Sequence, residues 1–366
     1  MRIGFDGKRA VQNFTGLGNY SRYVADILCH FYPENDYVLY APKKRENKRM
    51  NLLTGQYRQL TLAYPATSFW KKLSSLWRVW GITSQLEKEG IELFHGLSNE
   101  LPLNIHKSRI KSIVTIHDLI FLRYPQYYQS IDRKIYTYKF RKACENADKI
   151  IAISECTKRD IIRYFNIPDD KIEVVYQGCD VSFTHPVTEE KKEEVRKKYQ
   201  LPDHYILNVG SIEERKNILA AVQALPMLPQ HIHIVIVGRR TGYTEKVEQF
   251  IKDNGLGERV HIISNVPFND LPAFYQSAEI FVYPSRFEGF GIPIIEALYS
   301  GTPVVAATGS CLEEAGGPDS IYVNPDDITG LADAFKQIYS NSDKRKNMVE
   351  KGREFAKRFS EKQQSE

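Results

Sequence analysis

The sequence predicts an α/β protein made of two Rossmann-like domains, each with a parallel sheet, that face each other across a cleft. Short β-branched segments alternate with amphipathic helical segments along the chain, which is typical of parallel strands joined by crossover helices. The alternation stops once, in a charged segment at 184–204, and then restarts. The 366 residues also exceed one ordinary hydrophobic core and fit two domains of roughly 150–200 residues.

The first half of the chain contains apolar, β-branched segments that favour buried strands. They lie at 2–5, 36–41, 91–94, 111–116, 149–153 and 172–176. Apolar residues at helical spacing predict helices between these strands, near 17–31, 70–89, 132–147 and 155–166. Ser154 stands directly before the last of these helices, where its hydroxyl is suited to cap the first turn.

The second half repeats the pattern after the charged segment, which we expect to form a linker and one solvated helix. Strands are predicted at 205–209, 232–237, 260–263, 280–283, 303–306 and 321–323. Helices are predicted near 217–226, 244–253, 269–277, 292–300, 328–340 and 343–358. We therefore expect an N-terminal domain at 1–183, a C-terminal domain at 184–345 and a C-terminal helix at 346–366.

Composition limits the class of protein. The net charge of +5 is small for this length and is not gathered in a basic patch, so no nucleic-acid partner is expected. The five cysteines are scattered without a CxxC pair, which indicates neither a zinc site nor a disulfide framework. The N-terminus enters a strand at once, and no apolar run reaches the roughly 18–20 residues that a membrane span needs. We expect a cytoplasmic protein with reduced thiols.

The segment FWKKLSSLWRVW (69–80) combines aromatic and basic residues, as helices that lie on a membrane surface do. Two interpretations stay open at this point. One is peripheral contact with the inner face of the membrane, and the other is a packed helix with one solvent-exposed edge.

The strongest chemical signal is the segment YPSRFEGFGIPIIEALYSG (283–301), in which a buried strand runs into a glycine-containing loop and then a helix. Glycines let the backbone approach a ligand closely, and Pro293 suits the first turn of the helix. The helix N-terminus would favour a phosphate. Glu288 before the helix and Glu296 about one turn inside it offer carboxylates to sugar and ribose hydroxyls.

Three further loops follow predicted strands. The segment VGSIEERKN (209–217) presents Arg215 and Lys216 where a parallel strand ends, and two cations there are able to neutralise a diphosphate. The segment TGLGNY (15–20) follows the first strand and lacks the third glycine of a full GxGxxG motif. His117, followed by Asp118, lies at the carboxyl end of another strand, where ligands bind in open α/β sheets.

Together these segments resemble the retaining glycosyltransferase family 4, whose members have the GT-B fold and include many bacterial mannosyl- and glucosyltransferases. The resemblance covers essentially the whole chain, and the block from Glu288 to Glu296 is its most specific part. The matching segments are TGLGNYSRYV (15–24), TIHDL (115–119), AISECTKRDI (152–161), VVYQGCD (174–180), VGSIEERKN (209–217), VPFNDLPAFYQSAEIFVYPSRFEGFGIPIIEAL (266–298) and GTPVVA (301–306).

The resemblance implies a role for each loop. The turn at Gly16 and Gly18 would cover the donor diphosphate from the N-terminal domain, which would also bind most of the acceptor. His117 would face the donor sugar near its anomeric carbon. Arg215 and Lys216 in the C-terminal domain would stabilise the diphosphate.

The resemblance also assigns the long motif of the C-terminal domain. Glu288 would act in catalysis by holding the sugar hydroxyls, with the backbone N–H groups of Phe290 and Gly291 nearby. Glu296 would hold the ribose hydroxyls. Many members carry Arg or Lys where this chain has Ser211, and their last helix is longer and crosses back onto the first domain. We therefore expect one phosphate contact fewer, and a C-terminal helix that is short or truncated.

The resulting hypothesis is retaining, metal-independent transfer of a hexose from a nucleotide-diphosphate sugar to a glycan or lipid-linked glycan. No cofactor and no metal site are expected, because the sequence has no metal-chelating Asp-x-Asp motif at a strand end. Mannose is the expected sugar by analogy with bacterial family members. The alternatives are an epimerase of similar architecture, an oxidoreductase that binds a dinucleotide, and a non-catalytic nucleotide-sugar or carbohydrate-binding subunit.

Overall fold

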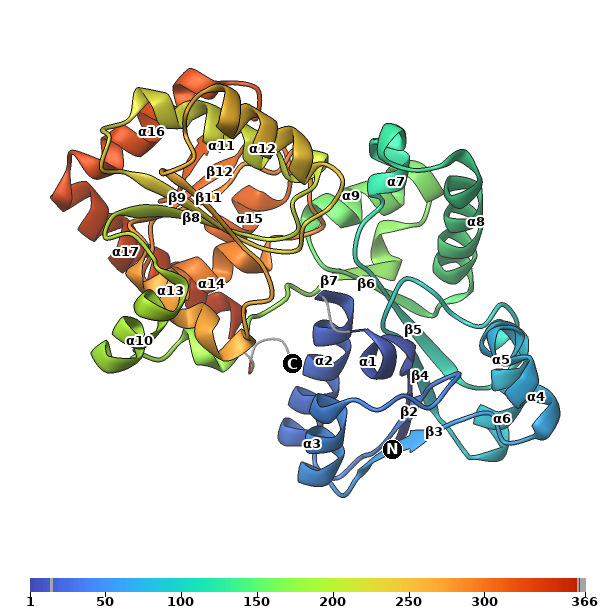
Figure 1. Cartoon of the computed structure of the whole chain (residues 1–366). Helices are drawn as coiled ribbons and strands as arrows, with labels where there is room; N and C mark the ends of the chain where they lie inside the picture. Colours follow the sequence, from blue (N-terminus) through green and yellow to red (C-terminus); the bar gives the residue numbers. More distant parts are fainter. Residues whose placement is uncertain (14–15, 361, 363–366) are drawn as a thin grey trace. The chain divides into compact units, whose positions relative to one another are not determined.

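The structure is a computed structural model and describes residues 1–13, 16–360 and 362. The chain divides into two compact units, Met1–Gln177 and Gly178–Ser360, and each contains one all-parallel sheet flanked by helices (Figure 1). The prediction of two α/β domains with parallel sheets is confirmed. The units meet at Gln177 and Gly178, slightly ahead of the boundary expected after residue 183.

The sheet of unit 1 has seven strands in the order β3-β2-β1-β4-β5-β6-β7. Their bounds are β1 (Arg2–Asp6), β2 (Asp36–Tyr40), β3 (Leu60–Ala63), β4 (Leu93–Gly96), β5 (Lys111–Ile116), β6 (Lys149–Ala152) and β7 (Ile172–Val174). Strand order reverses where β1 pairs with both β2 and β4. In doubly wound sheets this switch point is where ligands bind, outside the carboxyl ends of the strands.

The helices of unit 1 connect these strands as crossovers. They are α1 (Lys8–Gln12), α2 (Gly16–Phe31), α3 (Lys48–Gln56), α4 (Ser68–Lys72), α5 (Ser74–Leu76), α6 (Ile82–Lys88), α7 (Ile120–Arg123), α8 (Ser130–Asn146) and α9 (Glu155–Phe165). Short turns are the π-helical η1 (Trp77–Gly81) and the 3₁₀ turns η2 (Ile105–Lys107), η3 (Pro125–Tyr127) and η4 (Asp169–Lys171). Ser154 caps α9 as predicted, because its hydroxyl accepts a hydrogen bond from the Thr157 N–H at 3.0 Å.

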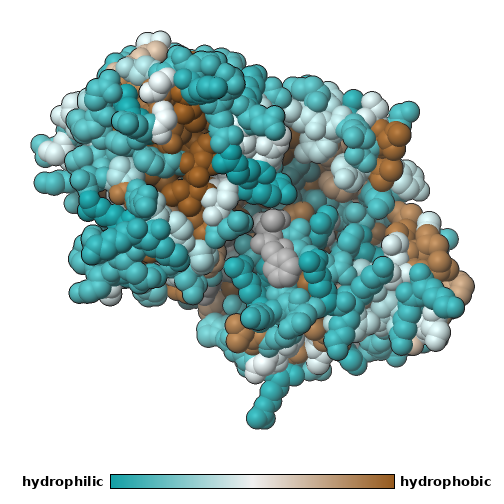
Figure 2. Space-filling view, viewed as in Figure 1, coloured by the Kyte–Doolittle hydropathy of each residue, from teal (hydrophilic) through white to brown (hydrophobic). Residues whose placement is uncertain are grey.

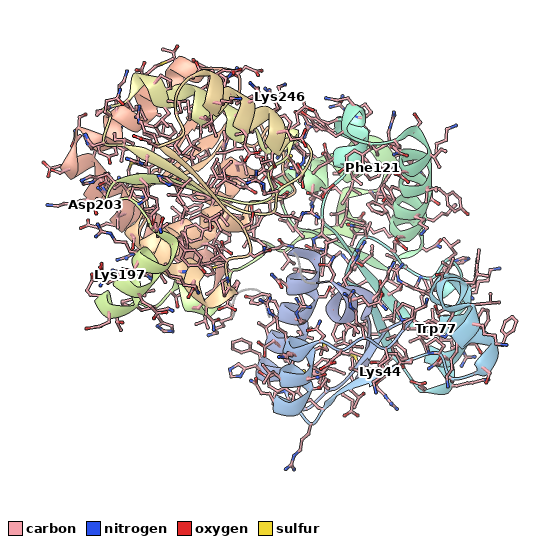
Figure 3. The ribbon with its side chains drawn as sticks, viewed as in Figure 1. Lys44, Trp77, Phe121, Lys197, Asp203 and Lys246 are labelled. Atoms are coloured by element: carbon pink, nitrogen blue, oxygen red, sulfur yellow. The ribbon has the colours of Figure 1, made fainter. Side chains whose placement is uncertain are left out.

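Two features of unit 1 differ from the sequence prediction. Strand β3 was not predicted, because it lies at the sheet edge and only Leu60 among its residues is buried. The single helix predicted at 70–89 is broken into α4, α5, η1 and α6. The π-helical turn η1 places Trp77 in the core, where its side chain is fully buried and its indole N–H donates to Gln85 at 3.1 Å (Figure 3).

Apolar side chains alternate between the two faces of the unit 1 sheet, as the period of a strand requires. On β2, Val38 and Tyr40 pack into one cluster with Trp77, while Tyr37 and Leu39 pack into the other. Both faces are therefore covered, which is the usual state of an all-parallel sheet.

The sheet of unit 2 has six strands in the order β10-β9-β8-β11-β12-β13. Their bounds are β8 (Tyr205–Val209), β9 (His233–Val237), β10 (Val260–Ile263), β11 (Ile280–Tyr283), β12 (Val304–Ala307) and β13 (Ile321–Val323). All the strands predicted for this half of the chain are present. The order reverses between β8 and β11, which pair directly at the centre of the sheet.

The helices of unit 2 include the charged segment and the C-terminal helix. They are α10 (Glu189–Tyr199), α11 (Ile218–Ala224), α12 (Thr244–Asp253), α13 (Leu271–Ser277), α14 (Ile292–Ser300), α15 (Leu312–Gly316), α16 (Ile328–Tyr339) and α17 (Ser342–Ala356). The 3₁₀ turns are η5 (Val181–Phe183), η6 (Glu214–Lys216), η7 (Leu225–Met227), η8 (Phe268–Asp270) and η9 (Lys357–Phe359).

Two of these helices bear on the predicted domain limits. Helix α10 is the expected solvated helix, since Val195 is its only buried residue. Helix α17 packs against α14 and α16 within unit 2. Residues 361 and 363–366 of the predicted C-terminal segment lie outside the described residues. In the described part of the chain, no helix is long and apolar enough to cross a membrane.

Candidate active site

The loop after β8 carries two cationic residues, Arg215 and Lys216, beyond the end of the strand. Gly210 has φ +153°, a conformation that favours glycine, and a β-carbon there would lie 3.2 Å from Lys216 Nζ. The chain directly after β9 comes still closer, because a β-carbon on Gly238 would lie 1.7 Å from the Gly210 carbonyl oxygen. Asn217 adopts the left-handed conformation at φ 55° and donates a side-chain hydrogen bond to the Pro325 carbonyl at 2.8 Å.

The loop after β11 is joined to the β8 loop by hydrogen bonds. The Arg286 N–H donates to the Arg215 carbonyl at 2.9 Å, and the Arg215 guanidinium donates to the Phe287 carbonyl. Because β8 and β11 are neighbours at the switch point, both loops emerge at the same edge of the sheet.

Glu288, Arg215 and Lys216 form one ion-paired cluster at this edge. Glu288 Oε2 lies 2.8 Å from an Arg215 Nη atom, and its Oε1 lies 3.2 Å from Lys216 Nζ. The Ser285 hydroxyl donates to Glu288 Oε1 at 2.7 Å, and the Tyr283 hydroxyl lies 3.1 Å from the same oxygen. The Glu288 side chain is only 13% exposed. Both oxygens of the carboxylate therefore have partners within the protein.

The charges in this cluster stabilise one another. Burial by itself would raise the pKa of Glu288, but Lys216 and Arg215 more than offset that effect and lower the pKa to about 2. Burial likewise opposes charge on Lys216, yet the Glu288 carboxylate holds the pKa of Lys216 above its ordinary value. The three side chains carry two positive charges and one negative charge, so the cluster is suited to an anionic group that displaces or joins the carboxylate.

The N-terminus of α14 lies directly after this cluster. Gly291 precedes the helix with φ +138°, and a β-carbon there would come within 3.2 Å of the Leu312 side chain. Phe290 is buried, and the Cys311 thiol lies 2.9 Å from the carbonyl oxygens of both Glu288 and Phe290. Pro293 occupies the first turn, as predicted. The turn therefore has the shape of a helix terminus that accepts phosphate.

Glu296 lies inside α14 in a separate environment. Its carboxylate accepts a hydrogen bond from the Tyr275 hydroxyl at 2.7 Å. Burial raises the pKa of Glu296 to about 7, although the hydrogen bond from Tyr275 opposes that shift. A protein gains nothing in stability from burying such a carboxylate, so its position suggests use by a ligand.

The predicted glycine turn of unit 1 is the first turn of α2 and not a loop. A β-carbon on Gly18 would lie 1.9 Å from the Asn13 carbonyl oxygen, so Gly18 permits close packing of the chain on itself. A β-carbon on Gly16 would meet no atom within 4 Å. The neighbouring segment 14–15 lies outside the described residues. Gly16 thus has the open surroundings that a ligand contact needs, whereas Gly18 has a structural role.

His117 is buried at the end of β5 with a partner for each ring nitrogen. Nε2 lies 2.9 Å from the Leu97 carbonyl oxygen and must carry the proton, because a carbonyl only accepts. Nδ1 then accepts from the Gln177 amide at 3.2 Å. Burial lowers the pKa of His117 to about 4, so the ring is neutral at physiological pH. The Tyr20 ring on α2 packs edge-on against His117, with ring centroids 4.7 Å apart.

The structure brings the predicted site residues together in two groups. Unit 2 gathers Arg215, Lys216 and Glu288 into direct contact, with Phe290 and Gly291 in the adjoining turn and Glu296 farther along α14. Unit 1 places His117 next to the glycine turn through Tyr20. Among residues 1–13, 16–360 and 362, no group of three or more His, Cys, Asp or Glu side chains is arranged to hold a metal ion.

Several residues that hold this site were not predicted from the sequence. Tyr283 and Ser285 bind Glu288, Tyr275 binds Glu296, and Gln177 binds His117. Tyr283 and Ser285 lie inside the motif that was singled out, so their position was a usable signal. Gln177 and Tyr275 lie within the quoted matching segments at 174–180 and 266–298, but the sequence does not indicate which residues they contact.

Two family descriptions match consecutive parts of the chain. The model described as "Glycosyltransferase Family 4" matches residues 21–183, and the model described as "Glycosyl transferases group 1" matches residues 189–355. The O-antigen chain mannosyltransferase B of Escherichia coli is 31% identical over 274 residues, which cover 73% of this chain and 70% of that protein. The O-antigen chain mannosyltransferase RfbU of Salmonella typhimurium is 29% identical over 225 residues, covering 62% and 60% of the two chains.

Solved structures agree over the full length. HepE of Anabaena in complex with UDP superposes with a TM-score of 0.78 at 18% identity and covers 100% of this chain and 97% of its own. The sucrose-phosphate synthase of Thermosynechococcus elongatus has a TM-score of 0.77 at 20% identity, covering 98% and 94% of the two chains. These likenesses confirm the predicted GT-B fold. The two family descriptions and the relative at 31% identity show that the chain belongs to the family 4 and group 1 glycosyltransferases.

Proposed function

We propose that this glycosyltransferase moves a hexose, with mannose the best fit, from a nucleotide-diphosphate sugar to a glycan or lipid-linked glycan. We further propose that the anomeric configuration is retained and that no divalent metal is required. The mannose assignment is supported by the two relatives named above, whose names describe O-antigen chain mannosyltransferases.

The observation that carries the proposal is the cluster at the switch point of unit 2. Arg215 and Lys216 there are largely shielded from solvent, with side chains 15% and 16% exposed, and they contact Glu288 just ahead of α14. A diphosphate leaving group needs positive charge where its negative charge develops, and a metal ion or fixed cations are able to supply it. Each charge-assisted contact of this kind contributes roughly 2–4 kcal/mol to the stabilisation of a transition state.

The proposed reaction is a displacement on one face of the sugar ring. The bond between sugar C1 and the β-phosphate oxygen breaks, and a bond between C1 and the acceptor oxygen forms on the same face of the sugar. The proton of the acceptor hydroxyl passes to the departing phosphate oxygen. His117 is neutral and held through both ring nitrogens, so we assign it a contact with the donor sugar and no proton transfer.

A panel of nucleotide sugars tests the donor site. Thermal melts of the protein are recorded with GDP-, UDP-, ADP- and dTDP-sugars. A ligand present at a hundred times its dissociation constant should stabilise the folded protein by about 2.7 kcal/mol. A shift for GDP-mannose alone supports the proposal. The absence of a shift with every donor contradicts it.

Turnover and stereochemistry test the rest. Transfer to an added acceptor separates the enzyme from the alternative of a non-catalytic binding subunit. NMR of the product's anomeric proton reports retention or inversion. Rates measured in excess EDTA should equal those measured with added magnesium or manganese, and a rate that collapses in EDTA would refute metal independence.

A further inference from the structure

Unit 1 contains a cavity of about 670 Å³ that the donor site does not use. It opens between η1 and α8, with Val79 and Trp80 on one side, Ile135 and Tyr138 on the other, and Leu101 against them. Every residue that lines it belongs to unit 1. Its volume falls within the range of roughly 300–1,000 Å³ that is usual for small-molecule pockets.

Large apolar side chains surround the mouth of this cavity and remain exposed. Trp80 is 48% exposed, Ile135 is 45% exposed, and Leu73, Leu76 and Tyr138 are also exposed. Figure 2 shows brown, hydrophobic residues gathered on the right flank, where α5 and α8 lie in Figure 1. A soluble protein rarely leaves such a contiguous patch uncovered unless the patch binds something.

The inner end of the cavity is polar but already balanced in charge. The Arg78 guanidinium donates to Asp6 at 3.1 Å and to Glu100 at 2.6 Å. Lys139 lies 3.5 Å from Glu100 and supplies the second positive charge. This end therefore offers little to a charged ligand, whereas the walls offer apolar contact.

Positive charge collects at the mouth. Apart from Arg78 and Lys139, which pair at the inner end, residues 68–81 contain two basic residues and no acidic residue, and α8 contains four basic and two acidic residues. Lys134 lines the cavity next to Ile135 and is exposed. The chemistry therefore changes from apolar walls to a cationic rim, which complements a molecule with a hydrocarbon chain and an anionic head.

We infer that this cavity holds the hydrocarbon chain of a lipid phosphate, with the phosphate at the rim beside Lys134. A glycan does not suit the walls, because its hydroxyls would be buried without hydrogen-bond partners. In the context of the proposed function, on which this assignment of role rests, the lipid is the carrier of the glycan acceptor. The acceptor class would then be lipid-linked.

The binding test uses the whole chain and three probes: geranyl phosphate, geraniol and inorganic phosphate. Geranyl phosphate should bind and shift Trp80 fluorescence to the blue, and Trp80→Phe identifies the responding side chain. Geraniol should bind more weakly because it lacks the phosphate, and inorganic phosphate should leave the emission unchanged. Failure of geranyl phosphate to bind would overturn the inference.

Two variants locate the site. Ile135→Asp should lower the affinity for geranyl phosphate roughly ten- to hundred-fold, since a large aliphatic contact is replaced by a charge. Lys134→Glu should reduce the affinity for geranyl phosphate to that for geraniol. Leu52→Asp on α3 is the matched control, because Leu52 is 74% exposed in the same unit but distant from the cavity lining, and it should change nothing. Equal binding by Ile135→Asp and wild type would place the lipid elsewhere and refute the assignment.

A vesicle assay separates a chain-binding cavity from adsorption to a membrane surface. Vesicles of equal parts phosphatidylcholine and phosphatidylglycerol are floated with wild type, Ile135→Asp and a Lys71→Glu/Lys72→Glu variant. Suppose that the Lys71→Glu/Lys72→Glu variant no longer floats while Ile135→Asp alters neither flotation nor geranyl phosphate binding. The patch is then only an adsorption surface, and the inference fails.

The donor assay keeps the two proposals distinguishable. Ile135→Asp should keep the thermal shift with the nucleotide sugar but lose transfer to a prenyl-phosphate-linked acceptor. If wild type shows the donor shift but does not bind geranyl phosphate, the lipid site is wrong and the proposed function stands. If the donor shift is absent in wild type, the proposed function fails independently of the lipid result.

Discussion

Glu288 shows how much a single side chain depends on its surroundings. It is a buried carboxylate held by two cations and two hydroxyls, and its charge is stable only while those partners remain. Removing it leaves Arg215 and Lys216 facing each other in a poorly solvated site. Such uncompensated charge is costly, so we expect Glu288 to influence local stability as well as its proposed role in catalysis.

Glu288→Ala should lower the rate of transfer roughly a hundred- to thousand-fold while the fold persists. The substitution removes the carboxylate that is proposed to hold the donor sugar, whereas the cores of both units are untouched. Steady-state kinetics and circular dichroism measure the two effects. Glu245→Ala on α12 is the control, since Glu245 is exposed and outside the site. Near-normal turnover of Glu288→Ala would remove Glu288 from the catalytic machinery.

Lys216→Ala should weaken the binding of a nucleoside diphosphate more than the binding of the corresponding nucleoside. The Lys216 ammonium lies 3.2 Å from Glu288 Oε1, and its proposed partner is the diphosphate and not the base or the ribose. Calorimetric titration with both ligands measures the difference. Equal losses for the two ligands would show that Lys216 acts on the shape of the loop and not on phosphate.

Glu296 should make both stability and ligand binding depend on pH. Its pKa in the folded chain is about 7, against an ordinary value of 4.5, so the folded state holds the proton more tightly than the unfolded state does. The free energy of unfolding should therefore fall as pH rises from 4.5 to about 7. Nucleotide binding should strengthen as pH rises through about 7, because the ionised carboxylate accepts hydrogen bonds from ribose hydroxyls better.

Glu296→Gln tests this coupling. The variant should be more stable than wild type above pH 7, where wild type must bury a charged carboxylate, and it should bind nucleotide more weakly. Denaturant titrations at several pH values and nucleotide titrations supply the two readouts. A pH profile of stability that is identical in wild type and variant would show that Glu296 does not titrate in this range.

At the scale of the element, the first turn of α2 separates a packing glycine from an open one. Gly18→Ala should destabilise the chain by about 1–3 kcal/mol, because its β-carbon overlaps the Asn13 carbonyl oxygen. Gly16→Ala should leave stability unchanged or slightly higher, since alanine favours a helix and nothing lies within 4 Å.

The Gly16→Ala and Gly18→Ala variants also test the predicted role of this turn in donor binding. If α2 covers the diphosphate, Gly16→Ala should raise the KM for the donor without lowering the melting temperature. Thermal melts of both variants and kinetics of Gly16→Ala provide the data. An unchanged KM would show that Gly16 does not contact the donor.

At the scale of the whole molecule, each unit has its own sheet and core, so the chain should not unfold in one step. All three tryptophans, Trp70, Trp77 and Trp80, lie in unit 1. Tryptophan fluorescence should therefore follow unit 1 alone, while circular dichroism follows both units.

Donor nucleotide should raise the melting transition of unit 2 most, because the predicted phosphate and ribose contacts lie there. This would appear as a shift in the circular dichroism melt without an equal shift in the fluorescence melt. Coincident melts with equal shifts would instead show that the two units unfold cooperatively.

Local patterns in the sequence determined much of this protein. Alternation of strand and helix signals predicted both parallel sheets, and Ser154 and Pro293 marked helix starts that the structure confirms. The block from Glu288 to Glu296 was the most specific of the segments that together indicated the family. These features succeed because strand burial, capping and turn geometry depend on residues that are neighbours in the chain.

Tertiary structure alone decided the features that join distant segments. The pairing of Glu288 with Arg215 and Lys216, and the hold of Leu97 and Gln177 on His117, arise only when separate strands end at one sheet edge. Strand β3 carries too little buried surface for a sequence signal, and the break at η1 follows from the fit of Trp77 into the core. The physical reason is the same in each case: burial and charge pairing depend on which segments meet in space, and no local pattern records that.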